Sequence, residues 1–384
     1  VSSNKTSFIK TNLYPYNEPE LINLGNGKVM LIWVDDNGQK SDLNRTSLMY
    51  SIYDGSSWSE AKEIDETGTY NDRADVYVYD GKAYILWSKA NKEWTESMTL
   101  SQKLATLDLY YTVYDGESFT TPVKVNDDSN SIYEMDYSIA ATDNKVLVTW
   151  TENSENDIFN ENGTKSFYCK EFINNVAGEK TIVETNSEGF TEIDSGYIGT
   201  NKVIAYSYTN GSDSNQGTDI TINYNGNKNI ISNESSNNYE IRIKDDKLYY
   251  LNNSKLVEYD IANQTSQDII DGLNDYDILS NGDNKAIISI KPKEEGFDLQ
   301  AKYYNSSNNT WGEWIDITNY NKYIRKYSLI MSDTGKITAA LSLADMLDSG
   351  TQPEEAFGSS TLLVTDLDSS FDLEIGKDVY YDYD

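Results

Sequence analysis

Short runs of β-branched and aromatic residues alternate along the chain with tight-turn pairs. In one copy, the runs Val76–Tyr79 and Ala83–Trp87 flank the pair Asp80-Gly81. Asp-Gly and Asn-Gly pairs favour the positive φ angles of two-residue turns, so the pattern predicts a tight β-hairpin. Similar turns followed by a lysine recur about every 50 residues, the lysines being Lys28, Lys82, Lys145, Lys202, Lys247, Lys285 and Lys336. Seven such hairpins indicate an internal repeat.

Most repeats contain a second turn, most clearly at Tyr50–Trp58 and Tyr111–Phe119. Two hairpins give four strands per repeat, and four-stranded sheets repeated radially are typical of a β-propeller. We therefore predict an all-β fold, a seven-bladed β-propeller of four-stranded antiparallel blades, formed as one domain by residues 1–384. The expected blades are 19–71, 72–133, 134–190, 191–238, 239–275, 276–324 and 325–378. Residues 1–18 either close the ring or lie outside a complete last blade, and 379–384 are expected to lead into a following domain.

Charge excludes several partners. With 31 basic and 63 acidic residues the net charge is −32, so nucleic acid and an anionic membrane surface would be repelled. Apolar runs such as Val29–Val34 are too short to cross a bilayer, so we expect no membrane insertion. The chain begins at Val1 without a signal-peptide pattern, and we expect it to be part of a larger multidomain protein.

Histidine is absent, which excludes His-activated nucleophiles, His-ligated zinc and imidazole acid–base catalysis. The single cysteine, Cys169, lies in an apolar-alternating stretch and is expected to be a buried structural thiol. So few cysteines in a large acidic chain fit a bacterial extracellular or cytosolic protein better than a eukaryotic secreted one.

The second turns resemble degenerate Asp boxes, the turns between the outer strands of sialidase-like (BNR-type) propellers. Ser51, Gly55 and Trp58 match the Asp-box pattern, as do Thr112, Gly116 and Phe119, while the acid is displaced by one position to Asp54 and Asp115. The resemblance implies a fold rather than an activity. A sialidase would also need three arginines around the substrate carboxylate, and only Arg73, Arg242 and Arg325 could supply them. The expected order and spacing are absent, so we do not expect sialidase activity.

The long connections between second and third strands fall on one face of the predicted propeller, at 88–108, 151–165 and 343–360. Loops confined to one face suggest a shaped binding surface. Aromatic residues and acids recur just before the inner strands, where aromatic faces would stack on sugar rings and carboxylates would accept hydroxyl hydrogen bonds. The candidate ligand-binding residues are Tyr70, Asp72, Arg73, Trp94, Tyr133, Glu134, Asp136, Phe190, Glu192 and Asp194.

Two other interpretations of these residues stay open. In so acidic a chain, carboxylates occupy loops by composition alone, and the aromatic residues before the inner strands would serve equally well as core between blades. Two of the carboxylates could instead form the acid pair of a glycoside-active enzyme. We assign no catalytic residue and no cofactor, although the oxygen-rich loop Asp213–Asp219 leaves calcium as an open alternative.

The favoured prediction is a bacterial extracellular or cell-surface binding or adhesion module. It would recognise a glycan or a basic partner protein on the long-loop face, with Tyr70, Trp94, Tyr133 and Phe190 as aromatic platforms. The alternatives are a carboxylate-dependent glycoside-active enzyme and a structural spacer in a large surface protein.

Overall fold

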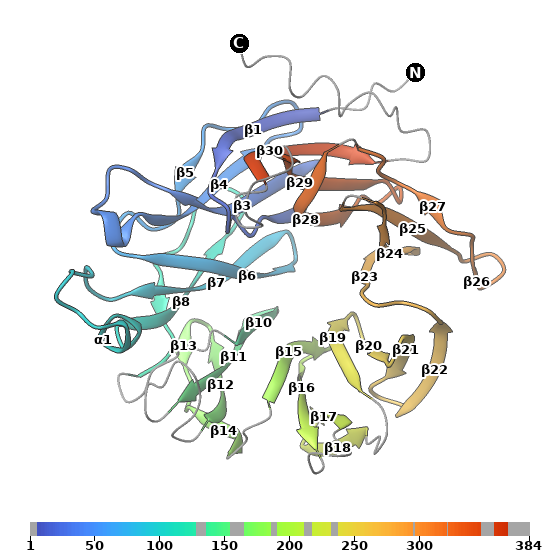
Figure 1. Cartoon of the computed structure of the whole chain (residues 1–384). Coiled ribbons are helices and arrows are strands. Elements are labelled where there is room, and N and C mark those ends of the chain that lie inside the picture. Colours follow the sequence, from blue (N-terminus) through green and yellow to red (C-terminus); the bar gives the residue numbers. More distant parts are fainter. Residues whose placement is uncertain are drawn as a thin grey trace. The chain divides into compact units, whose positions relative to one another are not determined.

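The structure is a computed structural model that describes residues 6–127, 136–153, 165–185, 190–210, 217–231, 237–294, 296–320, 322–346 and 357–367. The described chain is almost entirely β, with strands β1 to β30 in seven antiparallel sheets (Figure 1). Its helices are the single turn η1 (Asp42–Asn44) and the short α1 (Leu100–Leu104). The fold is a seven-bladed β-propeller with four-stranded antiparallel blades, as the sequence repeat predicts. No helix in the described ranges is long and apolar enough to cross a membrane.

Contacts divide the chain into two compact units. Unit 1 comprises Val1–Asn37, Thr46–Glu66 and Asp275–Asp384, and unit 2 comprises Gly38–Arg45 and Thr67–Asn274.

Unit 1 contains three blades. The strands of the first are β2 (Glu20–Gly25), β3 (Lys28–Asp36), β4 (Thr46–Tyr53) and β5 (Lys62–Glu63). Those of the second are β23 (Asp277–Asn281), β24 (Asn284–Pro292), β25 (Phe297–Asn305) and a split outer strand, β26 (Thr310–Trp311) with β27 (Ile315–Asp316). The third joins β28 (Tyr323–Met331), β29 (Ile337–Met346) and β30 (Phe357–Leu367) to β1 (Thr6–Leu13), which pairs antiparallel with β30. The first described strand is thus the outer strand of the last blade.

Unit 2 contains four blades. The first consists of β6 (Asn71–Tyr79), β7 (Lys82–Ala90), β8 (Leu107–Tyr114) and β9 (Val123–Lys124). The second consists of β10 (Tyr137–Thr142), β11 (Lys145–Asn153), β12 (Lys165–Ile173), β13 (Val176–Ala177) and β14 (Thr181–Thr185). The third consists of β15 (Phe190–Ile198), β16 (Asn201–Asn210), β17 (Gly217–Tyr224) and β18 (Asn227–Ile231). The fourth consists of β19 (Asn238–Lys244), β20 (Lys247–Asn252), β21 (Lys255–Asp260) and β22 (Thr265–Ile270). The inner strands β6, β10, β15 and β19 contact one another in sequence order.

The first hairpins of the first two repeats have the expected turn geometry, with positive φ at both Asn26 and Gly27 and at both Asp80 and Gly81. Asp80 and Gly81 both have positive φ, at 49° and 70°, because a two-residue turn of this type matches the twist of its strands. In two copies the recurrent lysine lies at the start of the second strand and reaches an acid near the end of the third. Lys247 lies 2.6 Å from Asp260, and Lys336 lies 2.7 Å from Asp366. In these copies the lysine makes a cross-strand ion pair.

The Asp-box-like turns are nearly identical in the two clearest copies. Asp54 Oδ1 accepts hydrogen bonds from the backbone N–H groups of Ser56 and Ser57 at 2.8 and 2.9 Å. Asp115 Oδ1 accepts the two equivalent bonds, both at 2.9 Å. These bonds favour the charged form and lower the pKa of both carboxyls. The displaced acid therefore still organises its turn.

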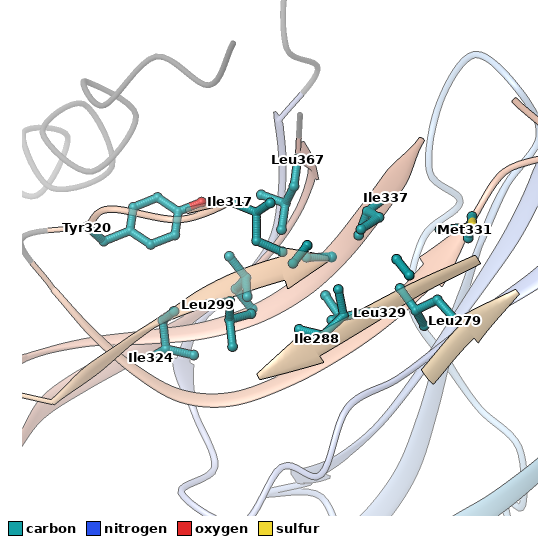
Figure 2. Packing of buried hydrophobic residues seen from close by; sticks show 14 of the residues in the cluster. Leu279, Ile288, Leu299, Ile317, Tyr320, Ile324, Leu329, Met331, Ile337 and Leu367 are labelled. Carbon is teal, nitrogen blue, oxygen red and sulfur yellow. The ribbon is translucent and has the colours of Figure 1, made fainter. Parts of the chain in front are cut away.

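The core consists of apolar side chains packed between neighbouring blades. Figure 2 shows one such cluster in unit 1, in which Leu279 and Ile288 from one blade pack near Leu329 and Ile337 from the next. The tryptophans of the second strands, Trp33 on β3, Trp87 on β7 and Trp150 on β11, are fully buried. Each indole N–H donates to a nearby polar side chain, Asp35, Asn71 and Glu152 respectively, so none is left unsatisfied.

The expected role of Cys169 is confirmed. Its thiol is buried in a cluster with Phe167, Tyr197 and Tyr206, and burial raises its pKa. A raised pKa lowers the thiolate fraction, which makes this an inert structural residue.

Candidate functional site

The predicted site residues that the structure describes lie in unit 2, on the strands and loops of its first three blades. Tyr70, Asp72 and Arg73 lie at the start of β6, Trp94 lies in the β7–β8 loop, and Asp136 precedes β10. Glu192 and Asp194 lie on β15; Phe190 begins that strand, but its side chain is outside the described part. Tyr133 and Glu134 lie outside the described residues.

Tyr70 and Trp94 form a stacked pair. Their ring centroids are 4.4 Å apart with an interplanar angle of 17°. The half-buried Trp94 packs against the apolar core of this blade, and its indole N–H donates to Thr106 Oγ1 at 2.8 Å. One face of each ring is therefore occupied by the other, which leaves less aromatic surface for a ligand than the sequence predicts.

The loop that carries Trp94 is fixed by one buried side chain. Asn44, from the η1 turn, accepts a hydrogen bond from the backbone N–H of Trp94 at 2.9 Å and donates to its carbonyl at 3.1 Å. It also donates to Ser41 Oγ at 2.8 Å. Further along, Thr99 and Gln102 form a capping box at the start of α1. A loop of this length is thus held in a defined shape.

Arg73 is exposed at the edge of the inner strand. Its backbone carbonyl accepts a 2.6 Å hydrogen bond from the hydroxyl of Tyr137 on β10, and its guanidinium lies 5.8 Å from the centre of that ring. Burial raises the pKa of Tyr137. Asp72 Oδ1 accepts from the backbone N–H of Arg73 at 2.7 Å. Asp136 forms an ion pair of 3.2 Å with Lys165 at the start of β12.

Glu192 and Asp194 bind the inner strand of the following blade. Glu192 Oε1 accepts from the backbone N–H of Glu240 at 3.0 Å, and Asp194 Oδ2 accepts from that of Ile243 at 2.6 Å. Burial raises the pKa of both carboxyls, and the charge of Glu240 raises that of Glu192 further. These oxygens stabilise the joint between β15 and β19.

Asp75 is an acid of the same inner-strand series that the sequence did not separate from its neighbours. Its Oδ2 accepts from the backbone N–H of Ile139 at 2.8 Å. Burial raises the pKa of Asp75 to about 7, and the charge of Asp194 contributes in the same direction. Strongly shifted carboxyls gather at functional sites more often than elsewhere, so Asp75 joins the candidates.

The β7–β8 loop also forms a hollow that the sequence analysis did not identify. It has a volume of about 570 Å³ and is lined by Asn91, Lys92, Ser97, Met98, Gln102, Ala105 and Thr106. Lys92 is the charged residue of this lining; the others supply amides, hydroxyls, the Met98 thioether and the Ala105 methyl group. The signal available in the sequence was the long loop with a Thr99-to-Gln102 capping box.

Within the described ranges, no three carboxylate or thiol side chains are placed so that they could hold a metal ion. The loop for which calcium was left open, Asp213–Asp219, is described only from residue 217 onward.

Comparison with solved structures finds distant similarity to a sialidase, a neuraminidase-like protein and a peptidase. Trypanosoma rangeli sialidase in complex with sialic acid is 10% identical, with a TM-score of 0.49 over 95% of this chain and 58% of that chain. The subtype N11 neuraminidase-like protein of A/flat-faced bat/Peru/033/2010 is also 10% identical, with a TM-score of 0.43 over 94% and 96%. An acylaminoacyl peptidase is 13% identical, with a TM-score of 0.51 over 85% and 51%.

This chain therefore spans little more than half the length of that sialidase and of that peptidase. At these identities the likeness shows the fold alone, and the sialidase matches, with TM-scores below 0.5, carry no argument about activity. No protein-family profile and no curated sequence matches the chain.

Proposed function

We propose that the chain is a non-catalytic binding module that holds a glycan in the hollow of the β7–β8 loop. The observation that carries the proposal is the hollow itself, about 570 Å³ in volume and lined mostly by uncharged hydrogen-bonding side chains. Ligand sites commonly have volumes of roughly 300–1,000 Å³, with a few polar groups that fix orientation. Amides and hydroxyls match sugar hydroxyls, and Met98 offers an apolar contact to a ring face.

The lining favours a glycan over a basic partner protein. The net charge of −32 attracts basic partners in general, but the charged residue of the hollow, Lys92, would repel one locally. The Tyr70–Trp94 stack serves as the support of this loop, which keeps the lining in place before a ligand arrives. Preorganisation of this kind reduces the entropy lost on binding.

A glycan array, run with added calcium and with a chelator, tests the proposal. We expect a hit whose affinity drops at least roughly tenfold, about 1.4 kcal/mol, when Met98→Trp fills the hollow. Glu96→Ala, a change in the same loop at a residue outside the lining, is the matched control and should bind as the parent chain does. A blank array under both conditions, or a hit that Met98→Trp leaves intact, would contradict the proposal.

Cell-surface location on a bacterium, within a larger protein, is part of the same proposal. The single cysteine of this large acidic chain supports a bacterial origin over a eukaryotic secreted one, and it fits an extracellular location as well as a cytosolic one. Immunolabelling of intact cells, compared with permeabilised cells, tests it.

The alternative function is a carboxylate-dependent glycoside-active enzyme. One observation favours it: Asp75 and Asp194 interact electrostatically, and both have raised pKa values, which suits a general acid beside a carboxylate. Against it, an oxygen of each is already engaged by a backbone N–H of the next blade. Turnover of a chromogenic glycoside that is abolished by Asp194→Asn but kept by Glu96→Ala would establish the enzyme.

A further inference from the structure

In unit 2, acidic side chains of two inner strands bind the backbone of the next blade. From β6, Asp75 accepts from Ile139 N–H on β10 at 2.8 Å. From β15, Asp194 accepts from Ile243 N–H on β19 at 2.6 Å, and Glu192 accepts from Glu240 N–H at 3.0 Å. Neighbouring blades have no continuous hydrogen-bond ladder between them, so these carboxylates supply polar links that the strands themselves do not.

Two of these acids converge on adjacent residues of β10. Ser138 Oγ donates to Asp194 Oδ1 at 3.2 Å, and the next residue, Ile139, donates its N–H to Asp75. Asp75 and Asp194 therefore approach β10 from the blades before and after it. Two carboxylates near one strand repel each other when both are ionised, and burial strengthens the repulsion.

The hydrogen-bond donors decide which of the two acids takes a proton first. Asp194 is bound by three donors, the N–H groups of Ser195 and Ile243 and the Ser138 hydroxyl, all of which favour its charged form. Asp75 accepts two backbone hydrogen bonds, from Ile139 and Val76, and the charge of Arg73 also favours its ionised form. Asp194 is therefore the better-stabilised anion, and Asp75 is the site of protonation.

The other groups around the pair do not cancel this difference. Arg73 on β6 and Arg242 on β19 lower the pKa values of Asp75 and Asp194 respectively, and each effect is smaller than that of burial. Arg242 also lies 3.5 Å from Glu240 on its own strand. Among the described residues, Tyr77 on β6 interacts with Asp194, and Tyr137 on β10 interacts with Asp75. Asp245 on β19 acts on Tyr77, and Glu192 lies two residues before Asp194 on β15.

We propose that Asp75 forms a pH-sensitive joint between the inner strands β6 and β10, which opens more readily when its carboxyl is ionised than when it is protonated. The hydrogen bond from Ile139 favours the ionised carboxyl, but burial together with the charge of Asp194 disfavours it more strongly. Asp75 does not line the loop hollow, so the test of this proposal does not depend on glycan binding. It would hold β6 and β10 together more firmly in mildly acidic than in neutral solution.

The direction follows from linkage. The pKa of Asp75 is about 7 in the folded chain, against about 3.9 for an unperturbed aspartate. The folded joint therefore binds the proton more tightly than the opened joint does. The stabilisation is fully present below about pH 4 and is lost as the pH rises through about 7.

Hydrogen exchange of the whole chain, read by mass spectrometry on a peptide containing residues 137–142, tests the proposal. After correction for the intrinsic exchange rate, protection of this segment should fall roughly tenfold between pH 6 and pH 8. Asp75→Asn should keep the protection nearly constant over this range. Glu117→Gln removes one negative charge from an exposed turn of the same blade and should behave as the parent chain does.

Two results would overturn the proposal. One is that the protection of residues 137–142 in the parent chain does not change between pH 6 and pH 8. This measurement uses the parent chain alone, so it does not depend on whether a variant folds. The other is an Asp75→Asn chain that folds and keeps the parent's pH dependence. Glycan binding plays no part in either readout, so failure here leaves the loop-hollow proposal untouched.

Discussion

At the scale of single residues, one fully buried amide determines the shape of the candidate site. Asn44 makes three side-chain hydrogen bonds, two of them to the backbone of Trp94, fifty residues further along the chain. The sequence shows Asn44 only as one residue of a polar loop, and nothing in the local pattern distinguishes it. Its role depends on a contact between distant segments, which periodicity and turn signals do not encode.

Asn44→Ala should therefore lower the stability of unit 2 and reduce the affinity of the hollow for a ligand. The substitution leaves the backbone N–H and C=O of Trp94 without their partners, at a cost of about 1–3 kcal/mol. Denaturant unfolding followed by tryptophan fluorescence measures the loss. Ser41→Ala, which removes one of the three bonds of Asn44, is the control. A loss no larger for Asn44→Ala than for Ser41→Ala would show that the amide does not hold the loop.

The predicted site shows the same limit of residue-level inference. Aromatic residues beside acids at the start of inner strands suggested ligand platforms, but Tyr70 and Trp94 stack on each other, and Glu192 and Asp194 bind backbone groups of β19. A residue type fixes what a side chain is able to bond. The neighbouring blade determines which partner that side chain actually contacts, and the spacing of residues in the sequence does not reveal that partner.

At the scale of elements, the sequence predicts the hairpins correctly because each turn has a conformational requirement that its own residues meet. Asp80-Gly81 needs two positive φ angles, and the Asp54 and Asp115 turns close on their own backbone, so both are local features. Four strands per repeat follow from these two turns. Connections with no such requirement were predicted only as long loops, and neither α1 nor the hollow beside it was expected.

The outer strands show where local signals weaken. In two blades the outer strand is split, into β13 with β14 and into β26 with β27, each pair sharing one partner strand. Outer strands are short and half-exposed, so the apolar alternation that identifies the inner strands is faint there. The pairing of β1 with β30 joins residues 347 to 359 positions apart, and the sequence left open whether the first strand closes the last blade.

At the scale of the whole molecule, excess negative charge opposes folding. There are 63 acidic residues for 31 basic ones, so half the acids cannot find a cationic partner even if every lysine and arginine is paired. Ion pairs with a buried acid, such as Lys10–Asp35 and Lys180–Glu152 at 2.7 and 2.8 Å, neutralise charge locally. The remaining carboxylates repel one another in the compact state more than in the unfolded chain.

Monovalent salt should therefore stabilise this protein at neutral pH. Raising sodium chloride from about 0.01 M to about 0.15 M shortens the screening length from roughly 30 Å to roughly 8 Å, which weakens repulsion between separated carboxylates more than attraction within close pairs. The midpoint of thermal unfolding should rise by a few degrees, measured with a chelator present so that calcium plays no part. At about pH 4.5, where many carboxylates are protonated, the same salt step should raise the midpoint less. An equal or larger rise at the lower pH would show that salt does not act by screening carboxylates, and the excess charge would then have to be balanced by ion pairs or bound cations.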